Sequence, residues 1–111
     1  MKVREVVSAL GLTVAAGRAG LDTPVTGGYV ADLLSCAMAG AEKGEIWITL
    51  QGHLNVVAVA SLNELAAVIV AEAKPVAAEA LAKAEEEGVA ILTTSMAGYE
   101  IAGRLWELGI R

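Results

Sequence analysis

Short apolar runs alternate with helix-forming stretches through the second half of the chain. The apolar runs are rich in β-branched residues, which favour strands, and they cover residues 45–50, 66–71 and 89–93. Each run is followed by a stretch with helical spacing or a helix-favouring composition. These stretches are residues 53–65, residues 76–87 with Pro75 in the first turn, and a closing helix that Thr94 or Ser95 caps and that ends near Leu108.

Strands that are apolar on both faces and alternate with helices indicate a parallel sheet covered on both sides. Valines within residues 53–65 make strand the local alternative there, and the neighbouring elements favour helix. We therefore expect an α/β fold with three layers (α/β/α), in which helices flank both faces of a mostly parallel sheet. The 111 residues suffice for one domain, residues 1–111. Aromatic residues are only 4% and Phe is absent, so Ala, Val, Leu and Ile must build the core.

The start of the chain predicts a helix, a short β-capable run at residues 12–16, and a loop. The helix is indicated by apolar residues at spacings of three and four, namely Val3, Val6, Val7 and Leu10. Gly11 suits a left-handed C-cap for this helix.

A hinge and a second helix are expected after the loop. Thr26, Gly27 and Gly28 form the hinge, because two glycines allow positive φ and close backbone approach, either to a ligand phosphate or to the next strand. Residues 32–41 form the helix, with Asp32 as its N-terminal cap.

The charge balance argues against nucleic acid as a partner. Thirteen acidic residues against eight basic ones give a net charge of −5, whereas nucleic-acid binding needs a clustered basic face. The apolar stretches at residues 56–62 and 65–71 are too short to cross a membrane, and residues 1–5 lead to no leader-like apolar run. We therefore expect a cytoplasmic protein with no membrane partner.

Three further residues carry expectations about packing. Cys36 is the single cysteine, which excludes an internal disulfide, and its apolar neighbours predict a buried, inert thiol. Trp47 and Trp106 are expected to be packing anchors. The closing helix is apolar on more than one side, which predicts a homo-oligomer, with a dimer as the expected form. No metal site and no cofactor are predicted.

Polar segments follow the expected strands at residues 51–55, 72–75 and 93–96. In open parallel sheets, ligands bind outside the carboxyl ends of the strands, where helix N-termini present unpaired N–H groups. If the strands are adjacent, the three segments converge on one edge. The candidate ligand-binding residues are Gln51, His53, Asn55, Thr93, Thr94 and Ser95, together with Thr26, Gly27 and Gly28.

Each candidate also has a structural explanation. Thr94 and Ser95 can be helix caps, and Gln51 and Asn55 can close a turn. His53 is the only side chain among them with an ordinary pKa near neutrality, which makes it the one candidate for acid–base work or phosphate contact. Neither GxGxxG nor GxxxxGK[ST] occurs, so a Walker-type phosphate loop is excluded.

Three blocks of the sequence together resemble the DRTGG domain. They are GLDTPVTGGYVADLL at residues 20–34, WITLQGHLNVVAVA at residues 47–60 and ILTT at residues 91–94. The resemblance covers nearly the whole chain, as a stand-alone copy of the domain. Thr23 stands where the motif usually has Arg, so any role of that Arg is missing or is taken by Arg18.

The DRTGG family is similar to the N-terminal domain of HPr kinase/phosphorylase and also occurs attached to phosphate acetyltransferases and CBS-domain proteins. The resemblance implies a non-catalytic regulatory domain that senses a small phosphate-containing ligand or binds a partner. It also implies a redox setting, with a hydrogenase-type redox enzyme as partner. The alternative is a small enzyme that acts on a phosphorylated or acylated metabolite through His53, with Asn55 and Thr94.

Overall fold

The computed structural model describes all residues, 1–111, as alternating strands and helices around one sheet. The strands are β1 (Thr13–Ala16), β2 (Gly27–Val30), β3 (Glu45–Thr49), β4 (Ala67–Val70) and β5 (Ala90–Thr93). The α-helices are α1 (Val3–Leu10), α2 (Leu34–Gly40), α3 (Leu54–Leu62), α4 (Ala78–Glu87) and α5 (Gly98–Glu107), and Arg18–Gly20 forms a 3-10 turn.

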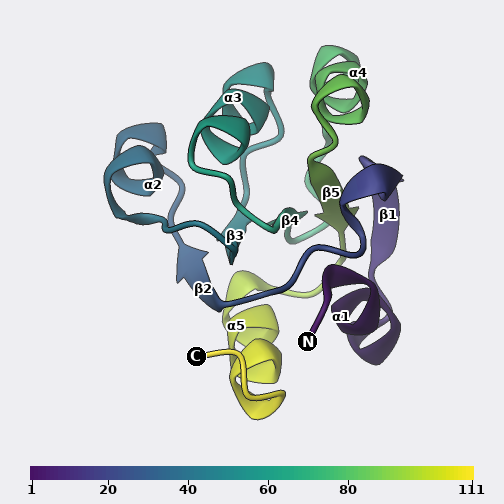
Figure 1. Ribbon diagram of the computed structural model, residues 1–111, viewed down its shortest axis with the longest axis vertical. Coiled ribbons are helices and arrows are strands. Elements are labelled where there is room, and N and C mark those ends of the chain that lie inside the picture. The colour runs from purple at the N-terminus through teal and green to yellow at the C-terminus, as the bar shows by residue number, and fades with distance from the viewer.

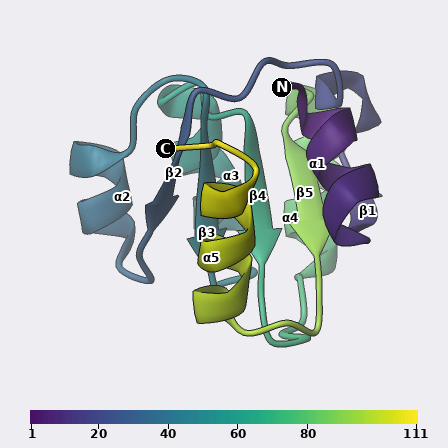
Figure 2. The same cartoon turned by 90° about the horizontal axis from the view of Figure 1, so that it is seen from below.

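The strands form one five-stranded sheet in the order β1-β5-β4-β3-β2. The strands β2, β3, β4 and β5 are parallel, and β1 pairs antiparallel with β5 at one edge. Figures 1 and 2 show α2, α3 and α4 over one face of the sheet and α1 and α5 over the other. The predicted α/β class, with a mostly parallel sheet between two helical layers, is confirmed.

The alternation of side chains along each strand divides the core into two clusters. Trp47, Val68 and Ile91 pack beneath α2, α3 and α4, whereas Ile46, Ile69 and their neighbours pack against α1 and α5. Trp47 is fully buried, and its Nε1–H donates to the Ala31 carbonyl oxygen at 2.8 Å. The packing role predicted for Trp47 is therefore confirmed.

The first helix begins and ends where its spacing predicts. It covers Val3–Leu10, with Val3 and Val6 buried, and Gly11 takes the left-handed C-cap conformation at φ 65°. None of the helices combines the length and apolar character that a bilayer-spanning segment needs.

Two expectations about the segment 26–41 are wrong. Gly27 and Gly28 lie in β2, paired in register with Glu45 and Ile46, so they form no hinge. Asp32 does not cap the following helix, which begins at Leu34 after Leu33 as N-cap. Its Oδ1 instead accepts hydrogen bonds from the Leu50 N–H (2.9 Å) and the Thr49 hydroxyl (3.1 Å), because the carboxylate faces the end of β3.

Two predicted helix starts are also wrong. Pro75 lies outside α4, which begins at Ala78, because the residues between them lie against the β3–α3 loop: the Ala77 N–H donates to the Gly52 carbonyl oxygen at 2.8 Å. Neither Thr94 nor Ser95 caps α5, whose N-cap is Ala97. The Thr94 hydroxyl oxygen accepts from the Met96 N–H at 3.2 Å, which closes a turn before the helix.

The expectations for Cys36 and Trp106 are wrong as well. Cys36 is exposed on α2, because Ala37 next to it is the residue of this helix that faces the core. Trp106 is 59% exposed on α5, because Ile101 and Leu105 are the residues that point inward.

A surface ion pair ties α1 to the loop after the 3-10 turn. Arg4 Nε lies 3.1 Å from Asp22 Oδ1, and this hydrogen bond, with the guanidinium charge, lowers the pKa of Asp22 below its ordinary value of 3.8. Because the folded-state pKa is depressed, the pair stabilises the fold above pH 3.8, and this contribution disappears as the pH falls through the lowered pKa. A carboxyl-carbon NMR titration should give an Asp22 pKa below 3.8 that returns toward it in Arg4→Gln. An unchanged pKa in that variant would contradict the assignment.

Candidate functional site

The carboxyl ends of β3, β4 and β5 lie side by side. Thr49 pairs with Val70, and Val70 pairs with Thr93, so the three loops that follow leave the sheet at one level. The expected convergence of residues 51–55, 72–75 and 93–96 on one edge is confirmed.

Backbone hydrogen bonds join these loops to one another. The Glu72 N–H donates to the Met96 carbonyl oxygen and the Ala73 N–H to that of Thr94, both at 2.9 Å. On the other side, Gly52 lies so close to the Pro75 carbonyl that a Cβ at this position would overlap it. Only glycine fits between these two loops, which fixes how closely they approach.

Two residues after β4 have left-handed backbone conformations. Glu72 has a φ of 59° and Ala73 a φ of 55°, a region that costs non-glycine residues on the order of 1 kcal/mol each. The hydrogen bonds that both N–H groups make to residues 94 and 96 hold this conformation. Strained backbone of this kind is typical of functional sites.

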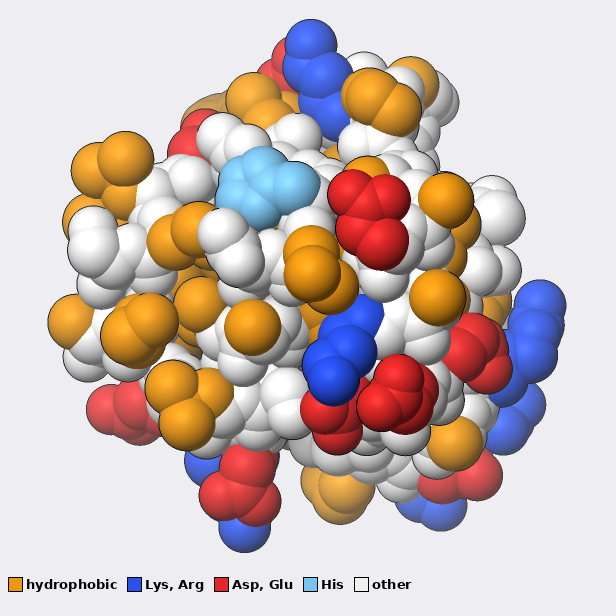
Figure 3. All heavy atoms as spheres, turned by 90° about the horizontal axis from the view of Figure 1, so that it is seen from above, with side chains coloured by type: hydrophobic (Ala, Val, Ile, Leu, Met, Phe, Trp, Pro, Cys, Tyr) orange, Lys and Arg blue, Asp and Glu red, His pale blue; other side chains and the backbone are white.

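A hollow of about 370 Å³ lies where the β3–α3 loop meets the segment before α4. Its lining residues are Leu50, Gly52, His53, Lys74, Pro75, Val76 and Ala77. His53 is exposed there as the N-cap of α3, and the chain's histidine is visible at the surface in Figure 3. Its side chain makes no hydrogen bond, and neither a carboxylate nor a hydroxyl lines this hollow.

A second hollow of about 370 Å³ lies beside the end of β5. It is lined by Thr13, Ala15, Ala73, Lys74, Val76, Leu81, Thr93, Thr94 and Ser95. The predicted residues His53 and Thr94 therefore line different hollows. Lys74 and Val76 line both, which makes Lys74 the charged residue that connects them.

A third hollow of about 240 Å³ lies at the end of β2 and beneath the N-terminus of α5. Its polar lining residues are Asp32, Thr49, Glu72 and Tyr99, and most of its other lining residues, Leu50 among them, are apolar. Because both of its charged side chains are acidic, this hollow disfavours a phosphate.

Gln51 and Asn55 do not line the hollow of His53. The Gln51 N–H donates to the Thr49 hydroxyl oxygen at 3.2 Å, and the Asn55 side chain is exposed on α3.

The candidates Thr26, Gly27 and Gly28 lie at the amino ends of the strands, opposite the carboxyl ends, because Gly27 pairs with Glu45 at the start of β3. The structure does not bring these three together with the other candidates.

The hollow beside His53 is suited to an anion. His53, which lines this hollow, is the N-cap of α3, so the partial positive charge at the N-terminus of the helix lies beside the hollow. Lys74 is the only Lys or Arg that lines any of the three hollows at this edge, and it makes no ion pair. The sequence marks Lys74 only as part of a polar segment, since sharing two hollows depends on how the loops fold.

Neither a protein-family model nor a curated protein sequence matches the chain. Among solved structures, the fold is similar to the CBS and DRTGG domains of the regulatory region of Clostridium perfringens pyrophosphatase, crystallised with its activator, diadenosine tetraphosphate. The TM-score is 0.71 at 16% sequence identity. The match covers 94% of this chain and 45% of that crystallised chain, so this chain spans less than half of the length of the chain it resembles. The likeness supports a DRTGG-like fold, as the three sequence blocks imply.

Proposed function

We propose that this chain is a non-catalytic regulatory domain that senses a small phosphate-containing ligand at the carboxyl edge of its sheet. The observation that carries the proposal is the position of Lys74, which lines both the hollow beside His53 and the hollow beside Thr94. The Lys74 ammonium group can therefore pair with a phosphate in either hollow.

The proposed phosphate site combines three kinds of donor. The Lys74 ammonium group supplies charge, the His53 side chain lines the same hollow, and the N-terminus of α3, which His53 caps, adds the partial positive charge of its N–H groups. The hydroxyls of Thr94 and Ser95 line the neighbouring hollow, where a second phosphate of the same ligand would lie. The acidic third hollow limits the phosphates to the Lys74 side of the edge.

The surroundings of His53 support sensing over catalysis. A general base is held in its tautomer and orientation by a hydrogen-bonded partner, and His53 has none. Thr94 lines the other hollow, so the set of His53, Asn55 and Thr94 proposed for an enzyme is not assembled in one place.

The structural relative supports the ligand class. The CBS and DRTGG domains of this relative belong to a regulatory region. Their activator is diadenosine tetraphosphate, a chain of phosphates between two nucleosides. A polyphosphate carries several anionic groups in a row and can use two neighbouring anion sites, which is what two hollows joined by Lys74 provide.

A thermal-shift series tests this function with diadenosine tetraphosphate, ATP, acetyl phosphate and pyrophosphate as probes. Binding at 100 times the dissociation constant adds about 2.7 kcal/mol of stability. A domain of this size then melts roughly 10 °C higher. Lys74→Ala should remove the shift, whereas Lys43→Ala, which breaks only an exposed pair with Glu64, should keep it. No shift with any probe, or equal shifts in both variants, would refute the proposal.

The homodimer, the redox-enzyme partner and the cytoplasmic location that the sequence suggests stay predictions. Sedimentation equilibrium of the purified chain tests the dimer, with twice the mass of 11.3 kDa as the expected result. A monomer at every concentration would contradict it.

A further inference from the structure

The strand β2 has one unpaired side, because it stands at the end of the strand order. The Ala31 N–H donates to the Ile48 carbonyl oxygen of β3 at 3.3 Å. Backbone groups alternate in direction along a strand, so the N–H groups of Val30 and Gly28 point to the free edge. Such an edge is a template for a further strand.

A mostly apolar groove lies beneath this edge, between β2 and α5. Two hollows of about 240 and 200 Å³ form it, and both are lined by Val30 and Ile48. The second is closed on the α5 side by Ala102, Leu105 and Trp106. Gly28 adds no side chain to its floor, which leaves this part of the groove open.

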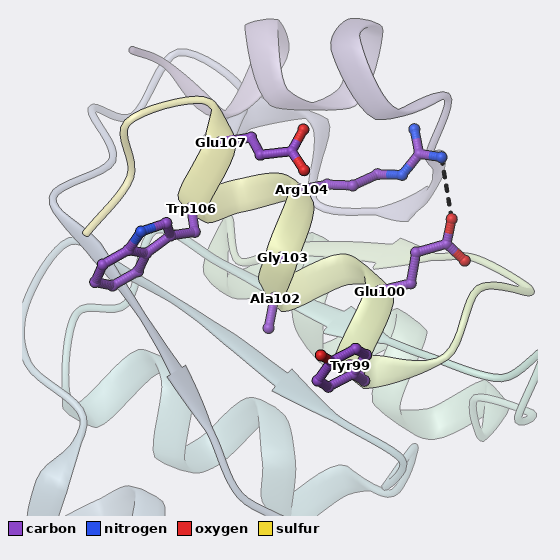
Figure 4. Close-up of a pocket in the computed structure, with 7 residues that line it drawn as sticks. All are labelled: Tyr99, Glu100, Ala102, Gly103, Arg104, Trp106 and Glu107. Atoms are coloured by element: carbon purple, nitrogen blue, oxygen red, sulfur yellow. Dashed lines mark hydrogen bonds and ion pairs between the residues drawn. The ribbon is translucent and has the colours of Figure 1, made fainter.

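Two aromatic side chains of α5, those of Tyr99 and Trp106, lie along the groove. Figure 4 shows Tyr99, Ala102 and Trp106 on one side of α5, and the charged residues on the other. Tyr99 is 93% exposed, Trp106 59% and Val30 61%, so β2 and α5 expose apolar surface to solvent along the groove. The Arg111 guanidinium lies over the Trp106 ring, 5.1 Å from the ring centre. The Arg111 Nε–H also donates to the Trp106 carbonyl oxygen at 3.3 Å.

The space beside β2 suits one added strand better than the sheet of a second copy. In both ribbon views α2 extends outward past the free edge of β2 (Figures 1 and 2). A second copy that continued the sheet by antiparallel pairing of its β2 would bring its own α2 to the same place. A single extended segment meets no such obstacle, since it lies between α2 and α5.

The charged residues that line the two hollows differ in sign. Asp32 and Glu72 line the hollow at the end of β2, and Arg111 lines the hollow at its start. A strand antiparallel to β2 places its N-terminal end beside Asp32 and its C-terminal end beside Arg111. Antiparallel pairing is also slightly the more stable arrangement.

We propose that the β2–α5 groove docks an extended peptide segment of a partner protein by strand addition. The segment runs antiparallel to β2, with apolar side chains at alternating positions in the groove, a basic residue near its N-terminal end and an acidic residue near its C-terminal end. Main-chain hydrogen bonds then supply affinity, and the groove selects the side chains. The proposal goes beyond ligand sensing and uses none of the hollows that Lys74 lines.

A fluorescein-labelled peptide of sequence KVTVTVTE tests the proposal by fluorescence anisotropy at low salt. We expect saturable binding to the full chain, weakened about tenfold in Trp106→Ala, since tryptophan anchors carry much of the energy of such interfaces. Leu62→Ala is the matched control, because Leu62 is similarly exposed and lies on α3, away from the groove. The Leu62→Ala chain should bind the peptide with the same affinity as the original chain. The charge-reversed peptide EVTVTVTK should bind more weakly than KVTVTVTE.

Amide NMR spectra of the same titration locate the peptide. The Gly28 and Val30 amide signals should move, and circular dichroism should show that each variant is folded. No saturable binding up to roughly 1 mM peptide, equal affinity in Trp106→Ala, or movement of other amides only would overturn the proposal. So would a dimer that Trp106→Ala dissociates, because the groove would then hold a second copy. Lys74→Ala should leave peptide binding intact, so failure of peptide docking is distinguishable from failure of phosphate sensing.

Discussion

Replacing Trp47 by alanine is expected to lower the free energy of unfolding by about 3–5 kcal/mol. The Trp47 side chain is fully buried in the cluster beneath α2, α3 and α4, and its neighbours on β2 and β4 are Tyr29 and Val68. Removing the indole leaves a cavity and also leaves the Ala31 carbonyl without its donor. Urea denaturation at 25 °C, followed by circular dichroism, measures the loss.

Trp106→Ala is the matched control for Trp47→Ala. Trp106 is 59% exposed, so its removal should cost about 1 kcal/mol or less. Equal losses in the two variants would contradict the assignment of Trp47 to the core and of Trp106 to the surface.

Gly52→Ala should have the second large effect, and it acts on fold and site together. A Cβ at residue 52 would overlap the Pro75 carbonyl, and backbone cannot give way as a flexible side chain can. The β3–α3 loop must therefore move from the segment before α4, with loss of the bond from the Ala77 N–H to the Gly52 carbonyl. We expect a loss of about 1–3 kcal/mol in the free energy of unfolding, and weaker phosphate binding in the hollow between these loops.

Gly103→Ala makes the same substitution where nothing lies within 4 Å of the new methyl group. Because residue 103 lies within α5, alanine should stabilise the chain there by about 0.5–1 kcal/mol. Urea denaturation and the thermal-shift series compare the two variants. A Gly52→Ala chain as stable as the original, with its ligand response intact, would refute the close approach of these loops.

The fold was largely predictable because burial acts on every residue of a central strand. Runs such as residues 45–50 and 89–93 are apolar on both faces, and only a sheet covered on two sides hides both. The edge strand β2 was missed because it contains Gly27 and Gly28 and is buried less uniformly. A glycine pair indicates a hinge by local preference, and the pairing with β3 overrides that preference.

Helix starts were predicted less well because they depend on partners far away in the chain. Asp32 has the side chain of an N-cap, yet the N–H of Leu50, eighteen residues on, donates to its carboxylate oxygen. The edge that holds the candidate site was predictable from the order of strands. The separation of His53 from Thr94, and the place of Lys74 between them, were not, because they depend on how three loops pack.

The most direct test of phosphate sensing is an amide NMR titration of the ¹⁵N-labelled chain with pyrophosphate. We predict saturable shifts of the Gly52 and His53 amide signals, because both residues line the hollow with Lys74, and loss of these shifts in Lys74→Ala but not in Lys43→Ala. Shifts confined to other parts of the chain, or none at all, would contradict it.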